Sequence, residues 1–244
     1  MSNHPYSPAY FAQLQANYRA GKPGVWKRIA LLREFLELSP TDTILETGFG
    51  QGTVAYELAT TGAQVTAVDC DPVAIQAAQV FLTGGPGWWP SNLRLIQADL
   101  AALPFAAQSF TKICFSEVVE HLADPRPVLT ELHRILRPGG RMAVTTWPNV
   151  SNLSWALKYR LGQGPVEDFA PQTPRRLRGL LEAAGFRVRR ERLTNFYAAL
   201  PNTRWEFDGC GQSNLVARLG ERFLTRRPWG AFFAASINLL CDRR

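Results

Sequence analysis

Residues 44–53 read Ile-Leu-Glu-Thr-Gly-Phe-Gly-Gln-Gly-Thr, and this stretch decides the fold. The apolar residues at its start predict a strand over 43–47, and helical spacing begins at Thr53. A glycine-rich turn between a strand and a helix lets the backbone approach a ligand closely, and the N–H groups that open the helix are free to bind it. The stretch therefore predicts a ligand site at the carboxyl end of a strand.

The spacing and charge of this turn narrow the class of ligand. Gly48, Gly50 and Gly52 follow a Gly-x-Gly-x-Gly pattern, whose third glycine comes one residue too early for the dinucleotide fingerprint. Glu46 precedes the first glycine by two residues, where a carboxylate would repel a pyrophosphate and attract an ammonium group. A dehydrogenase with a nucleotide cofactor is therefore the poorer interpretation. Asp69 ends the next predicted strand, where a carboxylate can accept hydrogen bonds from both ribose hydroxyls.

Away from this turn, strands alternate with helices of about ten residues, which is typical of βαβ units on a parallel sheet. The predicted strands cover 43–47, 64–69, 93–99, 111–117, 141–147, 186–193 and 229–240, and the predicted helices cover 25–38, 53–61, 72–82, 125–136 and 174–184. Arg137-Pro138-Gly139-Gly140 is expected to stop the fourth of these helices. We expect a single domain over 1–244. Its parts are an N-terminal helical lid (1–40), a core (41–194), a substrate-side insertion (195–228) and the last strand (229–244).

Further motifs join the glycine turn in a resemblance to the class I S-adenosylmethionine (SAM) dependent methyltransferases. These motifs are VTAVDCDP, QADLAALPF, and the run from SFTKICFSEVVEHLADP to LHRILRPGGRMAVTTWPN, and the likeness extends from about residue 43 to residue 193. The resemblance implies a Rossmann-like, doubly wound α/β fold whose seven-stranded sheet ends in an antiparallel strand. It also implies SAM as the cofactor.

The resemblance assigns cofactor-binding roles residue by residue. It places Glu46 and the glycine turn at the amino acid part of SAM, and Asp69 at the ribose. It places Asp99, which ends the third predicted strand, and Leu100 at the adenine. The full set of residues expected at the cofactor is Glu46, Gly48, Gly50, Gly52, Asp69, Cys70, Asp99, Leu100 and Ser116.

Methyl transfer from a sulfonium is an in-line displacement, so the protein chiefly aligns the acceptor with the methyl group. A hydroxyl or ammonium acceptor also needs a general base. We predict that His121, with Glu117, serves the catalytic step, because both follow the fourth predicted strand at its carboxyl end. Aromatic residues in segments placed to roof the acceptor, or else to pack in the core, are Tyr10, Phe11, Tyr18, Trp26, Trp147, Phe196, Tyr197, Trp205 and Phe207.

The segment Glu-Val-Val-Glu-His-Leu over 117–122 is similar to two subgroups of the family. These are the ubiquinone-type O-methyltransferases and the small-RNA 3′-end methyltransferases. In the second subgroup, Glu117, Glu120 and His121 would be metal ligands, together with a downstream histidine that this chain lacks. Asp168 stands near that place and is an alternative ligand. We expect no metal. If they are not ligands, one of Glu117 and Glu120 lies near the cofactor, and the other caps a helix or pairs with an arginine.

The predicted function is methyl transfer to oxygen or carbon of a small-molecule acceptor of the quinone, lipid, polyketide or sugar type. One alternative is an RNA methyltransferase, because residues 126–244 carry 20 basic against 9 acidic side chains. We expect no DNA partner, and an arginine-rich solvated surface explains the charge better than RNA does. Another alternative is a SAM-binding scaffold without transfer activity.

The composition excludes two further classes. No apolar run reaches the length of about 18 residues that a membrane span requires, so we expect no transmembrane segment. The first ten residues lack the layout of a signal peptide. The four cysteines are scattered and form no pair with metal or disulfide spacing. We therefore expect a cytoplasmic protein with reduced thiols.

Overall fold

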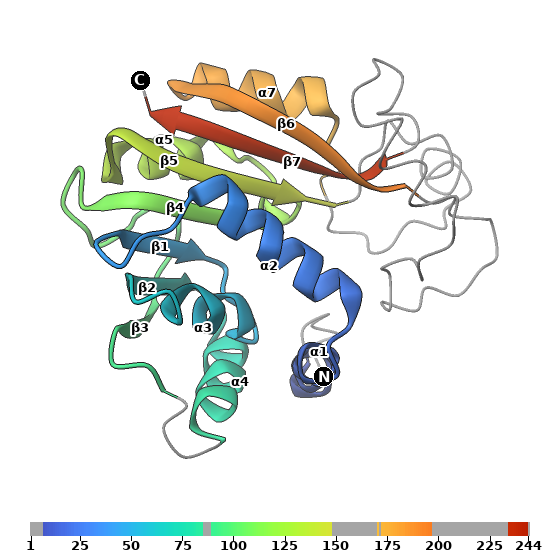
Figure 1. The fold of residues 1–244 in the computed structure, drawn as a ribbon. Helices are drawn as coiled ribbons and strands as arrows, with labels where there is room; N and C mark the ends of the chain where they lie inside the picture. The colour runs from blue at the N-terminus through green and yellow to red at the C-terminus, as the bar shows by residue number, and fades with distance from the viewer. Residues whose placement is uncertain (1–6, 85–88, 148–169, 171, 197–233, 244) are drawn as a thin grey trace.

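The chain is organised around one seven-stranded sheet with the order β3-β2-β1-β4-β5-β7-β6 (Figure 1). The computed structural model describes residues 7–84, 89–147, 170, 172–196 and 234–243. The strands are β1 (Thr43–Thr47), β2 (Gln64–Asp69), β3 (Leu93–Gln97), β4 (Phe110–Ser116), β5 (Leu136–Thr146), β6 (Phe186–Phe196) and β7 (Ala234–Arg243). β1 to β5 pair in parallel, and β7 runs antiparallel to β5 and β6. The predicted α/β sheet with an antiparallel last strand is therefore confirmed.

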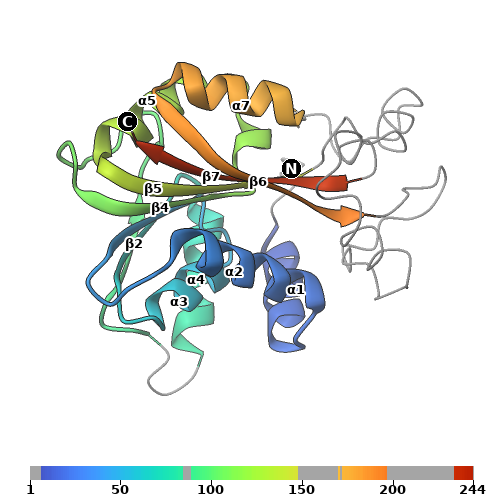
Figure 2. The same cartoon turned by 45° about the horizontal axis from the view of Figure 1, so that its top comes forward.

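Helices cover both faces of the sheet. They are α1 (Pro8–Arg19), α2 (Pro23–Leu36), α3 (Thr53–Ala59), α4 (Pro72–Thr83), α5 (Arg126–Ile135) and α7 (Pro174–Ala183), and a 3₁₀ turn, η1, spans Val119–His121. Figure 2 shows α5 and α7 on one face and α1 to α4 on the other. Within the described residues, no helix is both long and apolar enough to cross a membrane.

Successive residues of the central strands supply two separate hydrophobic cores. Ile44 on β1 and Cys114 on β4 pack with α2, α3 and α4. Their neighbours Leu45 and Ile113 point to the other face and pack with α5 and α7. A parallel strand that is buried on both faces reads as a continuous apolar run, and this is why β1 lacks an alternating pattern.

The junction of α5 and β5 differs from the prediction. The helix ends at Ile135, and the strand begins at Leu136, so the prediction that this strand begins at Arg141 is wrong. Leu136 pairs with Phe110, and the next pair is Lys112 with Arg141. The residues between them, 137–140, therefore form a bulge inside the strand. A Pro-Gly-Gly sequence suits a bulge as well as a turn, so local sequence did not distinguish the two.

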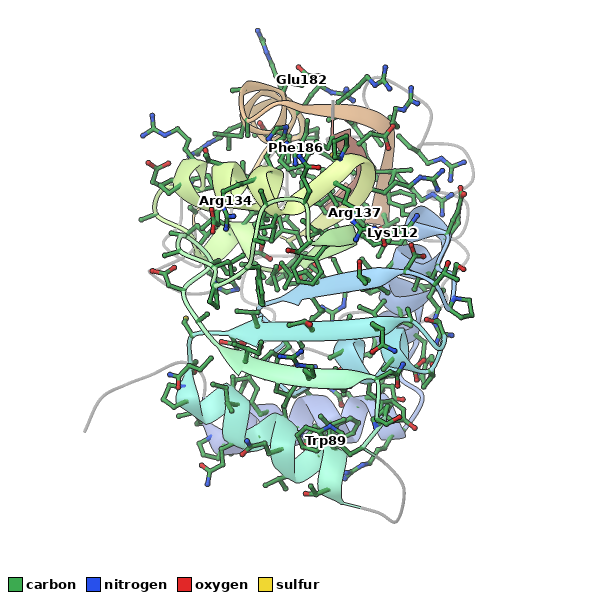
Figure 3. All side chains as sticks on the ribbon, turned by 90° about the vertical axis from the view of Figure 1, so that its left-hand side faces the viewer. Trp89, Lys112, Arg134, Arg137, Glu182 and Phe186 are labelled. Atoms are coloured by element: carbon green, nitrogen blue, oxygen red, sulfur yellow. The ribbon has the colours of Figure 1, made fainter. Side chains whose placement is uncertain are left out.

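Phe186 and Trp89 mark opposite ends of the molecule (Figure 3). In Figure 3, Phe186 and Arg134 lie in the half of the molecule that contains α5 and α7, and Trp89 lies at the opposite end, near α4. The indole N–H of Trp89 donates to the Leu93 carbonyl at 3.1 Å, which fixes the entry to β3. The predicted insertion over 195–228 falls almost wholly outside the described residues and stays a prediction.

Candidate functional site

The glycine turn connects β1 to α3, and all three of its glycines have positive φ angles. The values are +61° at Gly48, +51° at Gly50 and +83° at Gly52, a region that side chains strongly disfavour. Packing adds a second constraint at two of them. A Cβ on Gly48 would lie 2.6 Å from Cγ2 of Val118, and a Cβ on Gly52 would lie 2.9 Å from Cβ of Ala78. The turn therefore requires glycine for its own geometry before any ligand is considered.

Glu46 is buried on β1 immediately before this turn. The residue is 2% exposed, and Oε2 has no hydrogen-bond partner among the residues that the structure describes. Burial raises its pKa well above the usual value, the charge of Asp69 raises it further, and the charge of Arg28 lowers it. An unpaired buried carboxylate is costly unless a ligand satisfies it. A ligand ammonium group would do so, which fits the role that the sequence predicted for Glu46.

Asp69 ends β2 and holds the glycine turn in place. Its Oδ2 accepts the Gly50 N–H at 2.9 Å, and its Oδ1 accepts the Asp71 N–H at 3.0 Å. Burial raises the pKa of Asp69, and the hydrogen bonds from the Asp71 and Gly50 N–H groups lower it. Each carboxylate oxygen keeps a lone pair that can accept a further hydrogen bond. The side chain can therefore hold the turn and bind a diol together.

The residues predicted at the adenine follow β3. The strand ends at Gln97, so the prediction that Asp99 ends it is wrong. Asp99 instead closes a turn, because its Oδ1 accepts the Ala101 N–H at 2.9 Å. The Ala98 N–H donates to the Asp69 carbonyl at 3.1 Å and brings this turn beside the end of β2. The charges of Asp69 and Asp99 both raise the pKa of the Cys70 thiol, after the larger effect of burial.

Beyond this turn, Leu100 is partly buried against the core that contains α5. The structure therefore brings Asp99 and Leu100, which were predicted at the adenine, near the end of β2 and beside Cys70, which was predicted at the cofactor. The contacts of Asp99 and Leu100 with an adenine stay predictions.

The acceptor side of the predicted site follows β4. Ser116 is buried, and its Oγ lies 2.8 Å from Oγ1 of Thr145. Glu117 has a φ of +56°, an uncommon conformation for a non-glycine residue that ends the strand. Its N–H donates to the Thr145 carbonyl at 2.8 Å, and its Oε1 accepts the Thr145 hydroxyl at 3.3 Å. Burial raises the pKa of Glu117, and the charge of Arg28 opposes this shift.

Glu120 fastens the end of β5. Its Oε2 accepts the Thr146 hydroxyl at 2.9 Å, and its Oε1 accepts the Trp147 N–H at 3.3 Å. The partners of Glu120 are therefore groups of β5 and Trp147, and not the helix end or arginine that the sequence allowed for one of the two glutamates. Burial raises its pKa well above the usual value, and the charge of Glu117 raises it further. Within the described residues, no group of three potential metal ligands could hold an ion, and Asp168 lies outside those residues.

His121 ends the 3₁₀ turn that follows Glu117. Its N–H donates to the Val118 carbonyl at 2.9 Å, and its side chain is exposed. Desolvation by the surrounding protein lowers the pKa of the imidazole, so the ring is neutral at pH 7 and able to accept a proton. His121 and Glu117 thus stand at the same end of β4, as predicted, and their catalytic roles stay predictions.

Helix α1 supplies residues that sequence reasoning placed only loosely. Phe11 is 4% exposed, and its Cε1 lies 3.5 Å from the position of a Cβ on Gly50. Nε2 of Gln15 donates to the Ala77 carbonyl at 2.9 Å and to the Gln51 carbonyl at 3.3 Å. The helix therefore lies directly on the glycine turn. No local pattern in the sequence pairs 8–19 with 48–52, because the contact is tertiary.

Two of the aromatic residues that could either roof the acceptor or pack in the core pack against each other. Tyr18 stacks on Trp26 with a centroid distance of 5.1 Å, and its hydroxyl donates to Oε1 of Glu57 at 2.5 Å. Tyr197, Trp205 and Phe207 lie outside the described residues, as does the side chain of Phe196.

Arg28 on α2 is the functional candidate that the sequence prediction missed. Its charge lowers the pKa of Glu46, Glu117 and Tyr10, which come from β1, the end of β4 and α1. A signal was present in the sequence. Position 28 lies four residues before Leu32, on the apolar stripe that predicted the helix, and a charged residue on such a stripe needs an explanation.

Many of the arginines of the basic half pair with acidic side chains. Glu34 bonds Arg190 at 2.8 Å and Arg192 at 2.7 Å, and Arg189 bonds Asp242 at 2.5 Å. These pairs neutralise part of the charge that suggested RNA. The solvated-surface interpretation therefore suits the described part of β6 better.

Comparisons with known proteins agree with this geometry. Residues 45–144 match the family described as "Methyltransferase domain". A demethylmenaquinone methyltransferase of Thermus thermophilus is 29% identical over 198 residues, which cover 72% of this chain and 87% of that protein. An uncharacterized methyltransferase of Mycobacterium bovis is 31% identical over 130 residues, which cover 52% of this chain and 62% of that protein. This chain thus matches less than two thirds of the second relative's length.

A solved structure shares the fold. Geranyl diphosphate C-methyltransferase from Streptomyces coelicolor, in complex with Mg²⁺, geranyl diphosphate and S-adenosyl-L-homocysteine, has a TM-score of 0.64 and 16% identity. The match covers 89% of this chain and 80% of that one. The family match runs from β1 into β5, so it includes the strand ends that carry Glu46, Asp69 and Glu117. Residues 45–144 therefore match the methyltransferase domain family, and over this range the chain resembles the class I SAM-dependent methyltransferases.

Proposed function

We propose that this protein transfers the methyl group of SAM to oxygen or carbon of a small-molecule acceptor, and that a quinone-type ring is the first acceptor to test. The observation that carries the proposal is the unpaired carboxylate of Glu46 beside a glycine turn, which suits the ammonium end of SAM. The name of the Thermus thermophilus relative favours a quinone over lipid, polyketide and sugar-type acceptors.

Alignment of the reactants, removal of the proton and positioning of the acceptor fall to different parts of the site. SAM supplies an activated methyl group, so alignment at the ends of β1 and β4 accounts for most of the rate. The acceptor oxygen or carbon forms the new bond to the methyl group, S-adenosylhomocysteine leaves, and the acceptor loses a proton. His121 takes that proton, because it is exposed and its lowered pKa keeps it neutral. Glu117 positions the acceptor side through Thr145.

The test measures S-adenosylhomocysteine formation from SAM with a panel of reduced naphthoquinols that lack the ring methyl group, beside phenolic, lipid and sugar acceptors. We expect turnover with a naphthoquinol, and we expect His121→Ala to lower kcat by roughly 100- to 10,000-fold, the range for a lost general base. Affinity for S-adenosylhomocysteine should stay unchanged.

Arg94→Gln is the control, because Arg94 is an exposed residue of β3. It should retain parental turnover. If the parent binds S-adenosylhomocysteine but methylates nothing on the panel, the proposed transfer to these acceptors is wrong and the scaffold alternative replaces it. If His121→Ala retains full kcat, the assignment of the base is wrong.

We further propose that α1 acts as the lid of the cofactor site, because it lies on the glycine turn through Phe11 and Gln15. Gln15→Ala removes the two hydrogen bonds that tie α1 to the Gln51 and Ala77 carbonyls. Each bond contributes about 0.5–1.5 kcal/mol, so the lid should open more often and S-adenosylhomocysteine should dissociate several-fold faster. Stopped-flow tryptophan fluorescence measures that rate.

Gln13→Ala is the matched control for the lid. Gln13 lies on the same helix and is exposed, and its side-chain hydrogen bond among the described residues stays within α1, to Asn17 at 3.1 Å. Its substitution should leave the dissociation rate at the parental value. If Gln15→Ala also releases S-adenosylhomocysteine at the parental rate, α1 does not control release.

A further inference from the structure

Gln172 is a buried polar residue that the proposed transfer reaction does not use. It lies immediately before Thr173, whose side chain caps α7, and it is 0% exposed. Its Nε2 donates to the Ala170 carbonyl at 2.6 Å, whereas its Oε1 has no hydrogen-bond partner among the residues that the structure describes. A buried amide oxygen without a donor is costly, so this atom needs an explanation.

The hydrogen bond to Ala170 fixes the direction in which the Gln172 amide faces. A carbonyl oxygen requires a donor, so Nε2 must lie on the Ala170 side, because a rotation of the amide by half a turn would bring two acceptors together. Oε1 therefore faces away from that carbonyl and offers its lone pairs to a different group. Only a hydrogen-bond donor can satisfy it.

A second hydrogen bond places Gln172 near the acceptor end of the sheet. The Ala170 N–H donates to the Glu120 carbonyl at 2.6 Å, and Glu120 immediately precedes His121. The Glu120 carboxylate in turn accepts the Thr146 hydroxyl at the end of β5 at 2.9 Å. Gln172 is thus joined through Ala170 to the residue before the proposed base. This place is at the carboxyl ends of β4 and β5, where open α/β sheets bind ligands.

We propose that Gln172 determines acceptor specificity, and that its Oε1 accepts a hydrogen bond from a hydroxyl group on the aromatic ring of the acceptor. The inference rests on the proposed transfer to a small-molecule acceptor. A ring hydroxyl supplies the donor that Oε1 lacks, whereas an ether or carbonyl oxygen is itself an acceptor and would leave Oε1 unpaired. A site built to bond a hydroxyl strongly rejects an analogue that lacks it, because its buried polar group is then left without a partner.

The experiment compares 1-naphthol with 1-methylnaphthalene, in which a methyl group of similar size replaces the hydroxyl. Calorimetry measures both affinities on the full chain saturated with S-adenosylhomocysteine. Gln172→Met keeps the length of the side chain and removes the amide. We expect it to weaken 1-naphthol binding by about 5- to 100-fold, because the ligand hydroxyl is then buried without its partner. Binding of 1-methylnaphthalene should stay within about twofold of the parental value.

Two further variants make the result decisive. Gln172→Asn keeps the amide on a shorter side chain, which cannot hold the Ala170 carbonyl and reach the same ligand together. It should also weaken 1-naphthol alone, and it carries the test if Gln172→Met does not fold. Gln76→Met is the matched control, because Gln76 is an exposed residue of α4, on the opposite face of the sheet from α7 (Figure 2). It should change neither affinity.

The outcomes separate this inference from the proposed function. Equal losses for both ligands would mean that Gln172 only supports the fold, and no loss for either would mean that Oε1 does not meet the acceptor. Both results overturn the inference, as does a parent that binds neither ligand. S-adenosylhomocysteine formation with the acceptor panel tests the transfer separately. Turnover without the selective loss overturns this inference alone, and a selective loss without turnover overturns the proposed transfer while the hydroxyl site stands.

Discussion

Gly48→Ala is expected to displace the glycine turn and to abolish measurable binding of S-adenosylhomocysteine. An alanine at a φ of +61° costs roughly 1–2 kcal/mol. Its Cβ would also lie 2.6 Å from Cγ2 of Val118, and relieving such a clash in a packed interior typically costs about 1–3 kcal/mol more. The turn would move away from Val118, and this movement would separate Glu46 from the ligand. Thermal unfolding and calorimetry measure the two effects.

Two other variants separate the backbone strain from the clash. Gly139 has a similar φ of +72°, and a Cβ placed there meets nothing within 4 Å. Gly139→Ala should therefore show the loss in stability from strain alone, without a loss in binding. Val118→Ala in the Gly48→Ala background removes the clashing methyl groups and should restore part of the affinity. If the single variant Gly48→Ala binds like the parent, the turn is not the cofactor site.

The part of the site nearest to β1 was predictable because its determinants are local. A strand, three glycines at fixed spacing and one acidic residue lie within ten positions, and each has a physical role that the residue type reveals. Asp69 was predictable for a related reason, since the carboxyl ends of neighbouring parallel strands meet at one edge. The constraint on Gly48 from Val118 was not predictable, because the two residues are 70 positions apart in the chain.

The sequence did not predict the roles of residues whose partners lie far away in the chain. The charge of Arg28 among the apolar positions of α2 indicates that it acts on a partner, but which groups it acts on depends on the tertiary fold. Glu120 looked like a ligand or a cap, and it fastens β5 through Thr146, a contact that requires the tertiary fold. Asp99 was placed on a strand that ends at Gln97, because element ends are set by pairing more than by residue type.

Glu46→Gln is expected to stabilise the protein while it weakens cofactor binding. The substitution keeps the shape of the side chain and removes a buried charge whose Oε2 has no partner. Loss of the charge that meets the ligand ammonium should weaken S-adenosylhomocysteine binding by about 10- to 100-fold. Calorimetry measures that loss. The melting temperature at pH 8 should rise, because burial of the charge no longer opposes folding.

The pH dependence of the stability gained by Glu46→Gln provides a second test of the unpaired charge. Burial raises the pKa of Glu46 in the folded state well above the usual value near 4.5, so the folded state holds the proton more tightly than the unfolded state does. The free energy of unfolding contributed by this group therefore falls as pH rises from about 4.5 to the folded pKa, and the loss is complete above it. The stability gained by Glu46→Gln should vanish below pH about 4.5 and be largest at alkaline pH. A constant difference across this range would contradict an unpaired buried charge.

Glu57 provides the matched comparison, because it is also a buried glutamate but has its partners. Its Oε1 accepts the Tyr18 hydroxyl at 2.5 Å, and its Oε2 bonds Arg33 at 2.6 Å. Glu57→Gln should therefore lower the melting temperature, since it leaves the Arg33 guanidinium with a weaker partner. Opposite effects on stability from the same substitution would show that Glu57 is bonded within the protein and that Glu46 is held unpaired for a ligand. If both variants destabilise the protein equally, Glu46 serves the fold, and the ammonium site must be sought elsewhere.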